Sequence, residues 1–189
     1  SGILIQNGIT SRMNLLIDAT PIPNWSLYVS KVLALIKMTV LLLFVGMISC
    51  ILVQIYYGYF IFEIGIYLKR LFVIELVDYL IVILFSLFVQ SFFKNYLAGF
   101  FTIIVILIGM PFLYKIGVEQ QIYMFNSGSS GSYSDMNGFG TERTYFIYKL
   151  YWFLFSMVLA CLTLLIWRRG ILSGAKERLV TAKKRFNYK

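Results

Sequence analysis

Four long apolar stretches constrain the fold of this chain more than any other feature of its sequence. A helix needs about 20 mostly apolar residues to cross the hydrocarbon layer of a membrane, which is roughly 30 Å thick. The stretches that meet this requirement cover about 32–57, 76–93, 96–114 and 144–167. Four apolar helices in a chain of 189 residues leave too little polar surface to cover them in water. We therefore expect an all-α membrane protein with four transmembrane helices.

The composition agrees with lipid as the solvent and excludes several classes of enzyme. Apolar residues make up 60% of the chain and charged residues only 13%, against about a quarter charged in a typical soluble domain. The chain has no histidine, which rules out His-liganded metal sites and Ser-His-Asp triads. Cys50 and Cys161 lie in apolar stretches, so we expect neither a disulfide framework nor a thiolate metal site. A phosphate-binding GxxxxGK[ST] motif is also missing, and no catalytic residue, metal or cofactor is predicted.

Basic residues predict the orientation of the chain in the membrane. The tail 168–189 carries eight Lys and Arg residues against the single acid Glu177, and Lys and Arg favour the cytoplasmic side. We therefore expect the basic tail, the turn at Lys94 and the N-terminal segment 1–31 in the cytoplasm, which agrees with four crossings. The tail is expected to lie on anionic membrane lipid, and nothing else in the sequence supports a nucleic-acid partner.

Two longer loops, 58–75 and 115–143, are expected on the outer side. The first is too apolar for a free loop, and we expect a short helix or a re-entrant element near the membrane surface. The second is rich in Gly, Ser and Asn, and its densest polar cluster consists of Tyr133, Ser134, Asp135 and Asn137. This cluster is either a gate or cargo contact, or a capped surface loop.

A proline corner precedes the first apolar stretch. Pro21 and Pro23 each fix one φ angle and bias the preceding residue to an extended shape. Asn24 and Ser26 are candidate caps for the helix that follows. The result is a rigid cytoplasmic corner joined to a membrane span, which is either a simple interfacial turn or a surface on which a partner can push.

The corner has the sequence Asp18-Ala19-Thr20-Pro21-Ile22-Pro23-Asn24-Trp25 and is followed by Lys31. It resembles the cytoplasmic coupling segment of type-2 ABC transporter permeases. The rest of the chain is similar to a narrower subset, the bacterial permeases fused to a zinc aminopeptidase. The stretches that carry this similarity are GYFIFEIGIYLKRLF (58–72), YSDMNGFG (133–140), KLYW (149–152), WRRG (167–170) and, in the tail, KERLVTAKKRF (176–186).

The resemblance implies the membrane-spanning part of an ATP-driven exporter in a bacterial inner membrane. A separate ABC ATPase subunit would dock on the corner, and a second permease half or a homodimer is implied because permeases of this family work in pairs. A complete permease domain has six spans, so we interpret the chain as the C-terminal part of one. No HExxH peptidase motif can exist without histidine. The residues that the resemblance assigns to ATPase coupling are Asp18, Thr20, Pro21, Asn24, Trp25 and Lys31.

Two other interpretations stay open. One is a membrane anchor or scaffold, whose basic tail binds lipid and which moves no cargo. The other is an intramembrane enzyme, which needs acid–base groups inside the bundle. Its only candidate groups lie near an interface, without a partner at a defined spacing, and they are Glu63, Glu75, Asp78 and Asp135.

A transporter needs helices that pack in two alternative arrangements. Small residues let transmembrane helices approach closely, and such residues occur in the first and fourth apolar stretches. They are Gly46, Ser49, Cys50, Ser156 and Ala160, and they serve either this movement or ordinary helix packing.

Overall fold

Most of the chain is helical in the computed structural model. The residues that the structure describes are 2, 22–93, 95–118, 120–128, 133, 136, 138 and 142–166. Their elements are α3 (Asn24–Tyr56), α4 (Ile64–Leu68), η1 (Lys69–Glu75), α5 (Leu76–Phe92), α6 (Tyr96–Gly109), α7 (Phe112–Lys115), η2 (Gln121–Tyr123) and α8 (Glu142–Ile166). No β-strand occurs among these residues, so the all-α prediction is confirmed for the part of the chain that the structure describes.

In the described part of the chain, three helical stretches are long and apolar enough to cross a membrane. They are Asn24–Tyr56 with 33 residues, Ile64–Phe92 with 29 and Arg143–Ile166 with 24. At about 1.5 Å per residue, each is longer than the roughly 30 Å hydrocarbon layer. Many of their large apolar side chains are exposed on the isolated chain, as expected for surfaces that face lipid. The protein is therefore a helical membrane protein.

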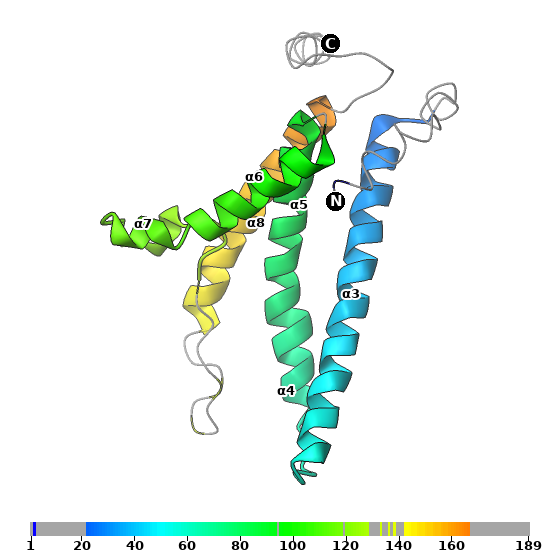
Figure 1. Ribbon diagram of the computed structural model, residues 1–189, viewed down its shortest axis with the longest axis vertical. Helices are drawn as coiled ribbons and strands as arrows, with labels where there is room; N and C mark the ends of the chain where they lie inside the picture. The colour runs from blue at the N-terminus through cyan, green and yellow to red at the C-terminus, as the bar shows by residue number, and fades with distance from the viewer. Residues whose placement is uncertain are drawn as a thin grey trace.

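Figure 1 shows the directions in which these helices run. α3 descends from the top of the view toward α4, the chain rises again through α5, and α8 rises in the same direction as α5. α3 therefore begins, and α8 ends, at one end of the bundle, which we call the corner end. The turn from α3 to α4 and the start of α8 lie at the opposite end, which we call the turn end.

The second long helix begins at Ile64 rather than at about 76, because much of the expected loop 58–75 is itself helical. α4 continues through the π-helical segment η1 into α5. The N–H of Leu76 donates to the carbonyl oxygen of Leu71, five residues earlier. A helix satisfies its own backbone groups, which an open loop at membrane depth does not.

The third apolar stretch forms a shorter helix than the sequence predicted. α6 has 14 residues, which is about 21 Å at 1.5 Å per residue, and it ends at Gly109 instead of continuing to about 114. Pro111 explains this end, because proline has no N–H and its ring clashes with the carbonyl group four residues earlier. The chain restarts as the short helix α7, and a fourth crossing stays a prediction.

The core lies where α5 meets α8. The largest fully buried side chains are those of Ile81, Leu87, Ser156 and Thr163. Ala160 of α8 packs with Leu87 of α5 and Tyr28 of α3. Ser156 and Ala160 are both buried, so the small residues of the fourth stretch lie at a close helix contact, as predicted.

The small residues of α3 behave differently. Ser49 and Cys50 are exposed, and no neighbouring described atom lies within 4 Å of a Cβ placed at Gly46. The expected close contact is therefore not made within the described chain. Only Tyr28 and Leu43 of the 33 residues of α3 are buried, so α3 is attached to the bundle along a narrow strip and leaves most of its surface to lipid or a partner.

Replacing Leu87 by alanine is expected to lower the free energy of unfolding by about 2–5 kcal/mol, because it leaves a cavity in the contact of α5 with α3 and α8. None of the Leu87 surface is exposed (0%), whereas Leu42 on α3 is 64% exposed. Leu42→Ala is therefore the matched control, with an expected loss below about 1 kcal/mol. Unfolding by SDS in mixed micelles measures both values, and equal losses would contradict this position of the core.

Candidate functional site

Lys149, in the second turn of α8, is a charged side chain with only 2% of its surface exposed. Its Nζ lies 2.8 Å from Oδ1 of Asp78, 2.6 Å from the carbonyl oxygen of Asn126 and 3.0 Å from Oδ1 of Asn126. An ammonium group has three N–H donors, and three oxygens are present to accept them. The buried cation is therefore satisfied by protein atoms alone.

Tyr145, one turn before Lys149, belongs to the same cluster. Its hydroxyl oxygen lies 3.1 Å from Oδ1 of Asp78 and 3.1 Å from the carbonyl oxygen of Ile74. Its ring centroid lies 5.3 Å from Nζ of Lys149, a distance at which the ring attracts a cation. Residues four apart share one face of a helix, which places both side chains opposite the first turn of α5. We call Asp78, Asn126, Tyr145 and Lys149 the Lys149 clamp.

The clamp holds the loop after η2 against α5 and α8. Asn126 has a φ of +56°, in the left-handed region that asparagine enters more readily than most residues. The ring centroid of its neighbour Phe125 lies 4.4 Å from that of Phe85 on α5 and 5.2 Å from that of Trp152 on α8. Polar contacts at Asn126 and aromatic contacts at Phe125 thus fix the loop from two sides.

The clamp corrects the expectation that the acidic residues lack partners. Asp78 pairs with Lys149, and Glu75 pairs with Arg70 at 3.0 Å. Every N–H of the Lys149 ammonium group is used within the clamp, so its geometry is that of a structural cation and not of a free base. Asp135 lies outside the described residues.

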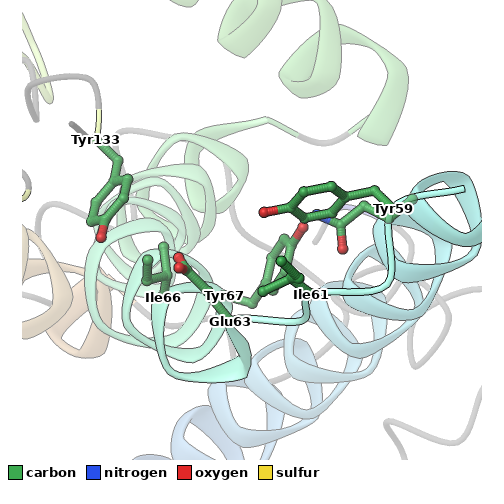
Figure 2. A pocket seen from close by; sticks show the side chains of 7 residues that line it. Tyr59, Ile61, Glu63, Ile66, Tyr67 and Tyr133 are labelled. Atoms are coloured by element: carbon green, nitrogen blue, oxygen red, sulfur yellow. The ribbon is translucent and has the colours of Figure 1, made fainter. Parts of the chain in front are cut away.

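A pocket of about 180 Å³ lies at the turn end. Its walls come from the last turns of α3, the turn after it, α4 and the chain before α8. Figure 2 shows the hydroxyl groups of Tyr59 and Tyr133 and the carboxylate of Glu63 facing the same space. The residues that line the pocket are Gln54, Tyr59, Ile61, Glu63, Ile66, Tyr67 and Tyr133.

Two acceptor groups of this pocket have no partner among the described residues. Glu63 forms no ion pair with any described residue. Oε1 of Gln54 is buried and accepts no hydrogen bond in the described part of the chain. None of the described lining residues is basic. Among the described lining residues, the pocket therefore presents the negative charge of Glu63 to a ligand.

Of the four residues in the predicted gate cluster, the structure describes Tyr133. Tyr133 lines the pocket. It therefore lies at the turn end of the bundle. Ser134, Asp135 and Asn137 lie outside the described residues. The contact of Tyr133 with cargo stays a prediction.

The predicted coupling residues lie in two parts of the chain. Asn24, Trp25 and Lys31 lie in the first turns of α3, and Trp25 is 61% exposed. The expected cap is wrong: α3 is capped by Pro23 without a side-chain hydrogen bond, and Oδ1 of Asn24 is buried without a partner. Residues outside the described part of the chain include Asp18, Thr20, Pro21 and the tail 168–189.

Sequence analysis did not predict the partners of Lys149 or the position of Gln54 in the wall of the pocket. One signal was present, because a charge inside an apolar stretch is costly and requires a partner, and Asp78 and Lys149 both lie at such positions. No local pattern marks Asn126 or Gln54. Their roles depend on the contact of segments that are far apart in the sequence.

These features define a class, that of helical membrane proteins with a buried polar clamp and a pocket at one end of the bundle. Comparisons of the chain with protein-family models, with curated proteins and with solved structures gave no match. Among the described residues, no group of three His, Cys, Asp or Glu side chains is placed to hold a metal ion.

Asp78→Asn and Lys149→Met are each expected to lower the free energy of unfolding by about 3–5 kcal/mol, because each leaves the other charge without its counter-ion. Asp78→Asn should cost more, since Lys149 is 2% exposed whereas Asp78 is 27% exposed. The double variant should lose less than the sum of the single losses, since it contains no unpaired charge.

SDS unfolding of the three variants measures these losses. Glu75→Gln is the control, because its ion pair with Arg70 is partly exposed, with 31% and 39% exposed side chains, and such a pair contributes about 0–1 kcal/mol. Strictly additive losses at Asp78 and Lys149 would contradict the clamp.

Proposed function

We propose that the chain is a membrane-spanning part of an ATP-driven ABC exporter, which couples a separate ATPase subunit to the transport of cargo across a bacterial inner membrane. Support comes from the sequence of the proline corner and from the course of α3. In this proposal the corner end faces the cytoplasm and the turn end, with its pocket, faces outward. The ATPase docks on Asp18, Thr20, Pro21, Asn24, Trp25 and Lys31.

The unbroken course of α3 carries the proposal. The helix has 33 residues, about 50 Å at 1.5 Å per residue, and it begins directly after Pro23. Its first turn carries the exposed Trp25, and its last turns carry Gln54, which lines the pocket. A rigid element thus connects the proposed ATPase surface to the outer pocket. Because few of its residues are buried, α3 can change its packing at low cost, as a switching element requires.

Four crossings with both termini in the cytoplasm are part of the proposal. α5 and α8 run in the same direction (Figure 1), so the residues between them return to the turn end. α6 covers part of that path, and the Lys149 clamp holds the loop that follows η2. Irregular backbone at membrane depth is stable where protein surrounds it, which is the situation of Phe125, buried between α5 and α8.

A second permease half, or a second copy of this chain, is also part of the proposal. The surface of α3 that carries Gly46, Ser49 and Cys50 is the candidate contact, because small residues allow close helix approach. That surface packs against no described helix.

Trp25→Ala is expected to reduce the amount of ATPase that co-purifies with the protein by about tenfold or more, because exposed tryptophans that anchor an interface contribute strongly to affinity. The measurement is purification of the tagged native protein in mild detergent, followed by mass spectrometry. Tyr57→Ala is the control, since Tyr57 is 79% exposed but lies at the turn end. Neither variant should change the SDS unfolding midpoint.

Purification of the unaltered protein without any ATPase would contradict the transporter proposal. A stable complex of that kind supports the membrane anchor or scaffold instead.

Labelling of single cysteines tests the four crossings. In a chain with Cys50→Ser and Cys161→Ser, a membrane-impermeant thiol reagent should label Tyr133→Cys in spheroplasts. The same reagent should label Trp25→Cys only after the membrane is opened. Labelling of both positions in intact spheroplasts would mean that Trp25 and Tyr133 lie on the same side of the membrane, which would contradict the proposed topology.

A further inference from the structure

The pocket at the turn end is lined by a negatively charged side chain. Among the described residues that line it, Glu63 alone is charged, and this carboxylate has no ion-pair partner in the described part of the chain. A carboxylate beside apolar walls, here Ile61 and Ile66, is stabilised by a cation. The charge of the pocket therefore selects a positively charged ligand over a neutral or anionic one.

The hydrogen-bonding groups of the pocket narrow the choice among cations. An ionised carboxylate such as that of Glu63 only accepts hydrogen bonds. The phenol oxygens of Tyr59 and Tyr133, which face the same space (Figure 2), accept as well as donate. A primary ammonium group brings three N–H donors, whereas a quaternary ammonium group brings none.

The volume of the pocket limits the size of the ligand. Its 180 Å³ equals about six water molecules at roughly 30 Å³ each. A small amine head group fits this space.

The position of the pocket indicates how such a group arrives. The turn end carries exposed aromatic side chains next to the pocket, with Tyr56 86%, Tyr57 79% and Phe60 68% exposed. Aromatic side chains concentrate at the level of the lipid head groups. The pocket thus lies where the head group of an amphiphile is found, with its acyl chains on the apolar helix surfaces nearby.

We propose that this pocket binds a primary ammonium group, presented by an amphiphile at the membrane surface, through Glu63 and the tyrosine hydroxyls. The proposal concerns binding alone and holds whether or not the chain transports cargo. Its success or failure is therefore independent of the ATPase experiment above.

The test compares two lipids that differ only in the methylation of the head-group nitrogen. The full chain in dodecyl maltoside micelles is titrated with dihexanoyl phosphatidylethanolamine and, separately, with dihexanoyl phosphatidylcholine, and native mass spectrometry measures the bound fraction. The ethanolamine lipid should bind about tenfold more tightly or better, because charge-assisted hydrogen bonds to the pocket are available only to it. Equal affinity for the two lipids would overturn the proposal.

Variants locate the binding in this pocket. Glu63→Gln should weaken binding of the ethanolamine lipid about tenfold or more and remove the preference between the lipids. Glu75→Gln, at the same end of the bundle but outside the pocket, should leave both unchanged. Tyr133→Phe should weaken binding by a smaller factor, whereas Tyr123→Phe, with Tyr123 66% exposed and outside the lining, should not. Unchanged binding by Glu63→Gln would overturn the site.

A titration with free phosphoethanolamine separates the two sources of the amine. Weak binding of the free compound, beside tight binding of the lipid, supports the amphiphile. Equal binding of both overturns that part of the proposal and assigns the pocket to a soluble amine.

Discussion

A cation buried among membrane helices has no water to complete its coordination, so protein atoms have to supply every acceptor. Lys149 meets this requirement with Asp78 on α5 and with two oxygens of Asn126 in the loop after η2. One ammonium group therefore sets the rotation of α8, its level along α5 and the position of the loop. The apolar contact of Leu87 with Ala160 follows from this alignment, because α5 and α8 run in the same direction from the clamp to the corner end.

The bundle has one tightly packed part and one loosely attached helix. α5 and α8 bury the central side chains against each other, whereas α3 contributes only Tyr28 and Leu43 to the buried set. Separating α5 from α8 therefore costs much free energy, because many buried side chains would lose their contacts. Moving α3 costs little, because few of its side chains are buried. In the proposed transporter, α3 would move while the clamped pair keeps its geometry.

The clamp and the pocket are in contact with each other. Ile66 lines the pocket and also packs against Ile74 and Tyr145, and Tyr145 belongs to the clamp. Glu63 and Asp78 lie on either side of the π-helical segment η1, and such segments occur often at functional sites. A ligand that changes the wall at Ile66 would therefore act on the side chain that supports the clamp.

The sequence alone determined the helical class, because the length of an apolar run is a local property of the chain. It placed the start of the first apolar helix at about 32, whereas α3 begins at Asn24. Local chemistry also decided the end of α6, because Pro111 cannot continue the helix. Tertiary structure alone decided the partner of Lys149, the burial of Ser156 but not of Ser49, and the grouping of Gln54, Glu63 and Tyr133. A helix that is apolar all round has no polar face to show which side meets its neighbours, so these pairings arise only when the helices pack.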